Sequence, residues 1–347
     1  MNLSSYAHLG PRDFEATWRS PSNIAFVKYW GKIGHQIPAN PSLSMTLKEC
    51  YTETRVRFAP AGELSVELCL DGRSEEKFGA KIKTYLGSLQ TELPWIKNLS
   101  VKIDTKNTFP HGTGIASSAS GLSAFALALT DYLYSLNDEL RDEGFWKKAS
   151  HLSRLASGSA CRSVFGGFTT WGESELPGTS NYFASPFEVH PDFDHLKDSV
   201  LVISGVEKNV SSTMGHGRML EHPFKEARYQ QAKMNFNSIV GALKSGDMEK
   251  MGRVLESEAL SLHSMMMTSP EAYILLKHNT IAAIEMIWAF RRETKLPLYF
   301  TLDAGPNLHL IYPESLQHKI KTFISHELSP LAEKVIEDER GEGPVKC

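Results

Sequence analysis

The sequence predicts an α+β fold, in which strands and helices are segregated in blocks along the chain. Two observations lead to this prediction. Short β-rich segments separated by Gly, Pro and Asn fill the first third of the chain, and long segments of helical periodicity dominate residues 223–293. A doubly wound α/β sheet would instead alternate one strand with one helix, and the pattern does not show that alternation.

The first part of the chain is expected to begin with strands at residues 23–29, 43–47, 52–58, 64–70 and 99–103. A helix follows Gly121, because Leu122, Phe125, Leu129 and Leu133 recur at helical spacing. A second helix is expected from about Glu143 to Leu155. Residues 166–171 then return to a strand pattern.

The chain turns polar around residues 188–197, and we expect a domain boundary there, with domains at 1–192 and 193–347. Asp247 is suited to cap the second of three long helices. The expected elements after the boundary are a strand at 199–204, helices at 223–243, 247–266 and 269–293, strands at 298–302 and 308–312 around a hairpin-like turn, a helix at 314–334, and a loose tail at 340–347.

Composition and charge exclude several classes of function. The 347 residues suffice for two domains, and the net charge of −3 gives no field that would attract nucleic acid. No apolar run approaches the roughly 18 residues of a membrane span. Four scattered cysteines and an N-terminus without a secretory pattern favour a reducing cytoplasm. The oligomeric state is not fixed by these features, and a homodimer is compatible with them.

The segment Phe109–Gly121 is the most informative part of the chain. Nearly every residue in it is small, and a helix follows directly. Small residues let a backbone approach a ligand closely, and the N–H groups at a helix start attract anions. We therefore predict a phosphate cradle formed by Gly112, Gly114, Ser117, Ser118 and Ser120. It lacks the Lys of the Walker type, and a small-residue turn packed on a helix is the alternative.

Three further segments suit an anionic substrate. Lys28-Tyr-Trp-Gly-Lys32 sets two ammonium groups beside two aromatic rings, although most lysines are simply solvated. Ser157-Gly-Ser-Ala-Cys-Arg162 either binds phosphate through its hydroxyls and guanidinium or merely ends a helix at Gly158. Asp303-Ala-Gly-Pro-Asn307 presents a carboxylate on a turn, where it either faces a ligand or caps its own backbone. Lys208–Thr213 is a weaker candidate. Together these groups indicate a phosphotransferase, since such catalysis is mostly positioning and charge stabilisation.

These motifs resemble those of the diphosphomevalonate decarboxylase family, within the GHMP kinase superfamily. The Lys-Tyr-Trp-Gly-Lys and Ser-Gly-Ser-Ala-Cys-Arg strings are specific to the decarboxylase branch, whereas the whole superfamily shares the small-residue loop. The resemblance runs in order from about residue 20 to residue 312, through residues 23–32, 42–47, 114–121, 157–162 with Gly166 and Gly167, and 302–307.

The resemblance implies a two-domain GHMP kinase fold. The N-terminal domain would be like domain 2 of ribosomal protein S5, the C-terminal domain would be ferredoxin-like, and the active site would lie in the cleft between them. In the implied reaction, ATP with Mg²⁺ phosphorylates the 3-hydroxyl of mevalonate 5-diphosphate. Phosphate and carbon dioxide then leave, and isopentenyl diphosphate remains. The expected partner is this small-molecule substrate, with neither nucleic acid nor membrane.

Residue by residue, the resemblance implies that Asp303 takes the proton of the 3-hydroxyl and that Lys28 lies beside it. A neighbouring ammonium favours the ionised carboxylate. Arg162 would lie near the substrate carboxylate and the developing charge, which makes Asp303, Lys28 and Arg162 the expected catalytic set. The implied substrate-binding residues are Tyr29, Lys32, Ser157, Ser159 and Arg162. The implied ATP contacts are Ser117, Ser118 and Ser120, and no metal ligand from the chain is implied.

Two departures from the family pattern keep alternatives open. The stretch Gly34–Pro41 is shorter than expected, with Pro41 where Ser or an Asn-Ser pair is usual, and Thr213–Arg218 does not align. Both could touch the 5-phosphate end, so a monophosphate substrate is the near alternative. A GHMP kinase without decarboxylation is the next alternative, but it should lack the pair of Asp303 and Lys28. A ligand sensor with a dead site should show a damaged phosphate loop, and this chain shows none.

Overall fold

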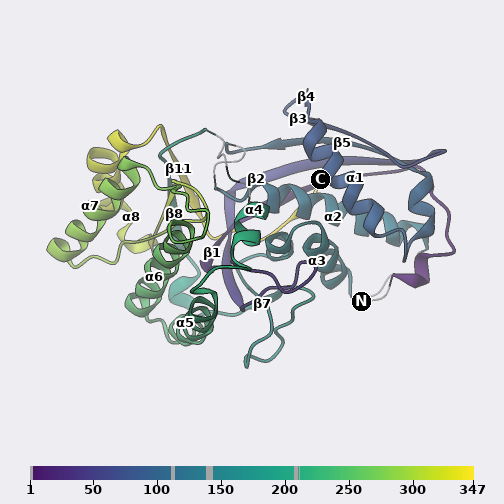
Figure 1. The fold of residues 1–347 in the computed structure, drawn as a ribbon. Coiled ribbons are helices and arrows are strands. Elements are labelled where there is room, and N and C mark those ends of the chain that lie inside the picture. The colour runs from purple at the N-terminus through teal and green to yellow at the C-terminus, as the bar shows by residue number, and fades with distance from the viewer. Residues whose placement is uncertain (1–2, 111–113, 138–143, 207–209, 211) are drawn as a thin grey trace.

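The molecule has two halves, each built on one β-sheet, and the larger half contains the first sheet (Figure 1). The computed structural model describes residues 3–110, 114–137, 144–206, 210 and 212–347. Within these residues the sheet has eight strands in the order β12-β1-β2-β5-β3-β4, and β6 pairs with β2 and β7. The strands are β1 (Phe14–Val27), β2 (Ser42–Pro60), β3 (Ser65–Leu70), β4 (Arg73–Ser74), β5 (Leu99–Asn107), β6 (Phe168–Trp171), β7 (Ser185–Phe187) and β12 (Val345–Lys346).

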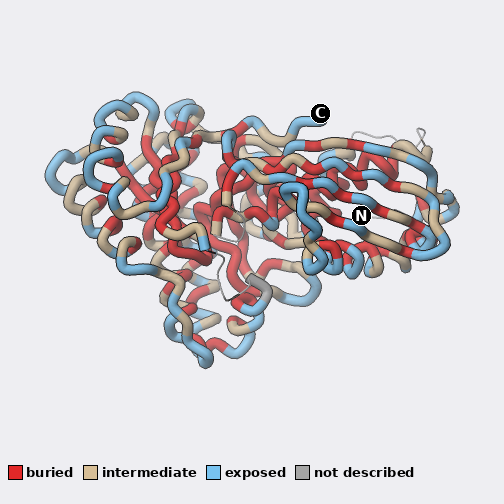
Figure 2. Tube along the Cα trace, turned by 90° about the horizontal axis from the view of Figure 1, so that it is seen from above, coloured by how far each residue is buried: buried red, intermediate tan, exposed pale blue. Residues whose placement is uncertain are grey.

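One face of this sheet carries α1 (Glu76–Ser88), α2 (Ser117–Leu136), α3 (Phe145–Ala156) and the 3₁₀ segment η4 (Gly158–Val164). Helix α2 is buried along nearly its whole length. Figure 2 shows that buried residues, in red, gather toward the interior of the molecule and that exposed residues, in blue, lie along its outer edges. Ala124, Ala126 and Ala128 are fully buried in it. Small side chains let α2 pack closely against β1 on one side and α3 on the other, which fixes the start of the helix near the end of β1.

The second sheet is four-stranded and antiparallel, in the order β11-β8-β10-β9. Its helices lie at the left of Figure 1. The grouping of strands and helices into separate blocks confirms the α+β prediction. The elements of this half are β8 (Leu196–Val202), α4 (Ser212–Arg218), α5 (Lys225–Ser245), α6 (Met248–Met267), α7 (His278–Thr294), β9 (Tyr299–Thr301), β10 (Leu308–Pro313), α8 (Gln317–Phe323) and β11 (Lys334–Glu339).

Several predicted elements are wrong in extent. Residues 43–47 and 52–58 belong to the single strand β2, and α1 is a helix that the sequence did not predict. The helix expected from Ser269 begins only at His278. Turns and irregular backbone precede it, and there Tyr273 and Leu275 pack against the buried apolar cluster that contains Trp30 and Leu262. The segment expected to be helical at 314–334 is helical only as far as Leu331, because α8 continues as a π-helix at Ile324–Leu328 and a 3₁₀ turn at Ser329–Leu331, and Lys334 already begins β11.

The prediction of a loose C-terminal tail is also wrong. Gly341 N–H donates to the carbonyl of Thr46, and the carbonyl of Gly341 accepts from Gly167 N–H, both at 2.8 Å. Strand β12 then pairs with β1 in the first sheet. A Cβ at Gly166 would lie 2.1 Å from the carbonyl oxygen of Glu342. Gly166 and Gly167 therefore make room for the tail of the same chain.

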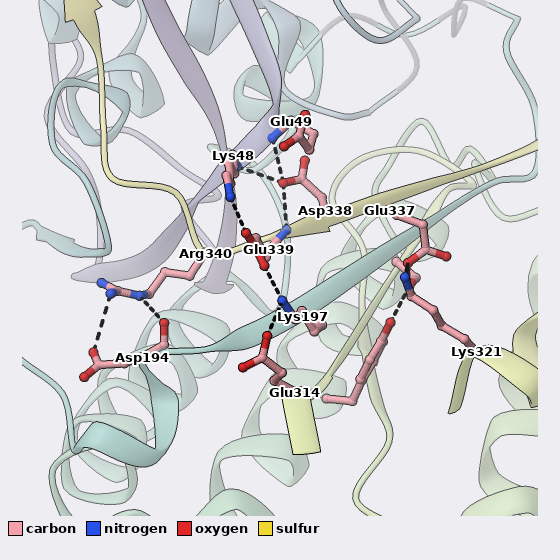
Figure 3. Close-up of polar contacts among 12 residues, drawn as sticks. Lys48, Glu49, Asp194, Lys197, Glu314, Lys321, Glu337, Asp338, Glu339 and Arg340 are labelled. Carbon is pink, nitrogen blue, oxygen red and sulfur yellow. Dashed lines mark hydrogen bonds and ion pairs between the residues drawn. The ribbon is translucent and has the colours of Figure 1, made fainter. Parts of the chain in front are cut away.

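The two sheets meet where β2 passes β11. The carboxylate of Asp338 accepts the backbone N–H groups of Lys48, Glu49 and Cys50 at 2.8–2.9 Å. Figure 3 shows this junction with the ion pairs around it. The junction leaves the end of β1 beside the turn between β9 and β10. No helix in the described ranges is both long and apolar enough to cross a membrane.

Candidate active site

Lys28 and Asp303 form an ion pair that joins the two halves of the molecule. Lys28 directly follows β1, and Asp303 lies between β9 and β10. The Nζ of Lys28 lies 2.8 Å from Oδ1 of Asp303 and also donates to the carbonyl of Ala25 at 2.6 Å. The side chain of Lys28 is 2% exposed and that of Asp303 is 25% exposed, so the carboxylate keeps an open side. Burial lowers the pKa of Lys28, and the Asp303 carboxylate opposes that shift.

The loop before α2 touches the turn that carries Asp303. Gly114 has φ of +95°, and a Cβ there would lie 3.2 Å from the Cα of Gly305. A side chain at position 114 would therefore be strained and crowded. Ser22 of β1 donates its hydroxyl to the carbonyl of Ile115 at 2.6 Å, which anchors the same loop. The start of α2, the end of β1 and the Asp303 turn thus come together in one place.

The three serines at the start of α2 have different surroundings. Ser117 opens the helix and is mostly buried, whereas Ser118 is exposed. Ser120 is fully buried, and its hydroxyl lies 2.6 Å from that of Thr52 on β2. Ser118 is therefore the hydroxyl on the open side of the helix start, and Ser120 packs the helix onto the sheet. Gly112, the other predicted cradle residue, lies outside the described residues.

Tyr29 is packed among aromatic rings but leaves its hydroxyl unpaired. Its ring contacts Trp171 edge-on at 4.6 Å between centroids, and His216 at 4.3 Å. Gly158 makes room for it, since a Cβ there would lie 2.8 Å from the Tyr29 hydroxyl. Burial raises the pKa of Tyr29. The buried hydroxyl has no hydrogen-bond partner among the described residues, which is costly unless a ligand supplies one.

Arg162 lies in η4, 3% exposed. Its Nη1 donates to the hydroxyl of Ser42 at 2.6 Å, and its Nε donates to Oδ1 of Asn23 at 3.2 Å. Burial lowers the pKa of Arg162, although a guanidinium keeps its charge under such conditions. Ser157 and Ser159 are half-buried at the start of the same segment. The predicted Ser-Gly-Ser-Ala-Cys-Arg motif is thus held beside the end of β1.

Lys32 is half-buried in a loop that a backbone bridge to Pro38 closes. Burial lowers the pKa of Lys32, and the ammonium of Lys81 lowers it further. The two positive charges repel each other, and a bound anion would relieve that repulsion. Lys81 belongs to α1, so no local motif pointed to it. Its charge acts on Lys32, and the sequence analysis did not predict it.

Helix α4 packs onto the Lys28–Lys32 segment. Nδ1 of His216 accepts the N–H of Gly31 at 3.0 Å, and the His216 ring also contacts Trp30. Arg218 at the end of α4 forms an ion pair with Glu271 at 2.7 Å and not with Asp303. Lys208, from the weaker candidate loop, lies outside the described residues. His216 belongs to the segment Thr213–Arg218 that could touch the 5-phosphate end, but its contact with Gly31 was not predicted, because the two residues are distant in sequence.

The combined site suits the binding of an anionic substrate and the stabilisation of negative charge on it. It holds a buried ammonium, a buried guanidinium, a half-open carboxylate and the start of a long helix. In the part of the chain that the structure describes, no three His, Cys, Asp or Glu side chains cluster closely enough to hold a metal ion. Any divalent cation here would rest largely on the oxygens of a bound phosphate compound.

The fold and the site define an enzyme of the GHMP kinase type, and comparisons with known proteins give the family. The model described as "Diphosphomevalonate decarboxylase-like N-terminal domain" matches residues 20–183. The model described as "Mevalonate 5-diphosphate decarboxylase C-terminal domain" matches residues 199–343. The chain therefore belongs to the diphosphomevalonate decarboxylase family.

Individual relatives agree with this assignment. The chain is 31% identical to a diphosphomevalonate decarboxylase of Ganoderma lucidum, over 87% of this chain and 79% of the relative. Its structure is similar to mevalonate diphosphate decarboxylases of Enterococcus faecalis (TM-score 0.81, 29% identity) and Staphylococcus aureus (TM-score 0.82, 27% identity). These matches cover 96% of this chain and at least 98% of each solved chain. A further match, at TM-score 0.83 and 29% identity over 96% of this chain and 99% of the other, is a complex with MVAPP, AMPPCP and magnesium.

Proposed function

We propose that this chain catalyses the ATP-dependent decarboxylation of mevalonate 5-diphosphate, a step of the mevalonate pathway of isoprenoid biosynthesis. The products are isopentenyl diphosphate, ADP, phosphate and carbon dioxide. Family membership supports the reaction, and the related complex with MVAPP, AMPPCP and magnesium supports ATP and Mg²⁺ as cofactors. Within this molecule, the observation that carries the proposal is the Lys28–Asp303 pair beside the start of α2.

Asp303 acts on the 3-hydroxyl of the substrate in this proposal. Its carboxylate accepts the hydroxyl proton while the oxygen attacks the γ-phosphoryl group. Lys28 donates a hydrogen bond to Oδ1 of that carboxylate and holds it in place. An ionised aspartate is a weak base, which suits a loose transition state in which the proton leaves late.

The second step needs no base. Loss of the 3-phosphate leaves an electron-poor carbon, and the substrate carboxylate releases carbon dioxide as its electron pair forms the new double bond. Arg162 is proposed to face the carboxylate and the departing phosphate, since it is buried and charged beside the end of β1. A guanidinium binds such planar anions in two-pronged fashion.

Separate groups are proposed to bind the two phosphate compounds. The unpaired hydroxyl of Tyr29 and the ammonium groups of Lys32 and Lys81 would bind the substrate diphosphate, together with Ser157 and Ser159. The ATP phosphates would lie at Gly114 and on the start of α2, at Ser117 and Ser118, whereas Ser120 is buried against Thr52 and is withdrawn as an ATP contact. The open oxygen donors, Ser118 and Asp303, are of the hard type that Mg²⁺ prefers, and Mg²⁺ would neutralise phosphate charge when bound.

The proposal extends to organisation and location. A boundary between domains 1–192 and 193–347 is supported by the gap between the two family matches and by the separate sheets of the two halves, while the terminal strand β12 returns to the first sheet. A cytoplasmic location is supported by four cysteines that are all free thiols. A homodimer remains a prediction, which the molecular mass in solution would test.

One assay tests the reaction. The purified enzyme is given ATP, Mg²⁺ and either mevalonate 5-diphosphate or mevalonate 5-phosphate, and ADP and carbon dioxide are measured separately. We expect equal release of both products and a higher kcat/KM with the diphosphate. Release of ADP without carbon dioxide would instead identify a kinase. A higher kcat/KM with the monophosphate would identify mevalonate 5-phosphate as the substrate.

A further inference from the structure

Helix α6 contacts the backbone of both members of the Lys28–Asp303 pair. Oε2 of Glu258 accepts the N–H of Lys28 at 2.8 Å. Nε2 of His263 lies 3.0 Å from the carbonyl oxygen of Asp303. Lys28 and Asp303 are 275 positions apart in sequence, so a single helix spans the junction at which they meet.

Glu258 is a fully buried carboxylate with three donors. Besides the N–H of Lys28, it accepts from Nη2 of Arg228 at 2.5 Å and from Nδ2 of Asn235 at 2.7 Å. A buried carboxylate is tolerated only when charge and hydrogen bonds compensate its lost hydration. This network therefore holds the Glu258 oxygens in fixed positions, and with them the backbone from which the Lys28 side chain extends.

His263 contacts the backbone of the other member of the pair, Asp303. It is 1% exposed, and a carbonyl oxygen can only accept, so Nε2 must carry the hydrogen. The same carbonyl also accepts the N–H of Gly305 at 2.7 Å. Two donors on one carbonyl fix the orientation of the Asp303 peptide. The direction in which the Asp303 side chain leaves the turn is fixed in consequence.

We propose that Glu258 and His263 are positioning residues for the proposed phosphoryl transfer. Glu258 sets the backbone of Lys28, and His263 sets the backbone of Asp303, so that α6 determines the separation and angle of the reacting pair. This inference rests on the proposed function. Neither side chain is required to touch the substrate. Because a misplacement of about 1 Å can cost on the order of 100-fold in rate, loss of either contact should be visible in kcat.

A matched pair of variants tests His263. His263→Leu removes the N–H donor and replaces the imidazole with an apolar side chain of similar bulk. His263→Gln keeps an N–H donor at a comparable distance from the backbone. We expect kcat to fall roughly 10- to 100-fold in His263→Leu, with KM for both substrates changed less than about threefold, and to recover most of that loss in His263→Gln. A Leu variant with parental kcat, or a Gln variant as slow as the Leu variant, would overturn the role of His263.

Glu258 is tested against a neighbour on the same helix. Glu256 is also largely buried, but it pairs with Arg291 at 2.7 Å and with Trp288, and touches neither Lys28 nor Asp303. Both Glu→Gln changes remove a buried ion pair and should lower Tm. We expect kcat to fall at least about 10-fold only in Glu258→Gln, measured well below its Tm. Equal kcat in the two variants would reduce Glu258 to a structural residue.

The parental enzyme separates this inference from the proposed function. If it releases carbon dioxide and Asp303→Asn does not, while His263→Leu and Glu258→Gln turn over normally, the positioning role is wrong and the function stands. If the parental enzyme releases no carbon dioxide from either substrate, the function itself is wrong.

Discussion

At the scale of single residues, the site is an excess of buried positive charge around one accessible carboxylate. Lys28 and Arg162 are both almost fully buried, and the positive charge of Arg162 adds to the lowering of the Lys28 pKa, which burial dominates. Such an arrangement is costly in the empty site and becomes favourable when a polyanion enters. Binding of a substrate that carries a carboxylate and a diphosphate would therefore offset the electrostatic repulsion between Lys28 and Arg162.

Arg162→Lys should impair the enzyme strongly. Arg162 contacts Ser42 and Asn23 through two different nitrogens, and a lysine cannot reproduce that geometry. We expect kcat/KM for mevalonate 5-diphosphate to fall at least about 10-fold, because two-pronged recognition is lost while the charge is kept. Steady-state kinetics on protein with a near-parental Tm would measure it. Unchanged kinetics would show that Arg162 only packs the core.

The pH dependence of kcat should reveal the pH at which Lys28 loses its proton. Burial lowers its pKa from the ordinary value of 10.5, so Lys28 loses its proton at lower pH than a solvated lysine does. We therefore expect kcat to decline with rising pH before pH 10.5 is reached. The profile would be measured from about pH 7 upward, with circular dichroism confirming the fold. A rate that stays constant up to that pH would contradict the assignment of Lys28.

At the scale of elements, the start of α2 combines a phosphate-loop position with a packing position. Ser118 is exposed, and Ser120 is bonded to Thr52. Ser118→Ala should raise KM for ATP or lower kcat without changing Tm. Ser120→Ala should instead destabilise the fold by about 1 kcal/mol, the usual net worth of a buried hydrogen bond. Nucleotide kinetics and thermal melts on both variants check this, and identical ATP behaviour in Ser118→Ala would argue against the cradle.

Elements governed by local signals were predictable. Asp247 caps α6 as expected, with its carboxylate accepting the N–H of Lys250 at 2.9 Å. Helices α2 and α5, and strands β9 and β10 around Asp303, also follow from periodicity and turn residues. Helix α1 was missed, since its segment is mostly polar and its apolar face is narrow. Strand β11 was missed because its residues are stabilised by pairing with β8, far away in sequence.

The site shows the same division. Motifs pointed to Lys28, Arg162 and Asp303, because each lies in a short and distinctive string. Lys81, Glu258 and His263 lie in ordinary helical sequence, and only the packing of α1 and α6 brings them to the site. The tail was misjudged for the same reason, since its partners are β1 and residues around Thr46. Sequence patterns identify groups that act locally, and they miss those whose role depends on distant partners.

At the scale of the whole molecule, Glu339 links the two sheets (Figure 3). It contacts Lys48 on β2 and Lys197 on β8, and Lys197 also pairs with Glu314. These contacts lower the pKa of Glu339 to about 2. The Lys28–Asp303 pair also spans the two halves, so the two halves are joined by ion pairs at both places.

Glu339→Gln should therefore lose stability in a pH-dependent way. A carboxyl with a lowered pKa stabilises the fold above its ordinary pKa of 4.5 and loses that contribution as the pH falls toward about 2. We expect the parental protein to be more stable than the variant at pH 6, and the difference to shrink on acidification. Urea melts at several pH values would measure the free energy of unfolding. A difference that does not change with pH would contradict the role of the Glu339 charge.

The central claim is that the carboxylate of Asp303, held by Lys28, performs the chemistry at the junction of the two halves. Turnover of Asp303→Asn, followed as carbon dioxide released from mevalonate 5-diphosphate and ATP, tests it most directly. Asparagine keeps the shape of the side chain and loses the base, so kcat should fall by roughly 10²- to 10⁴-fold in a protein with an unchanged fold. Release of carbon dioxide at near-parental rate by that variant would contradict the account.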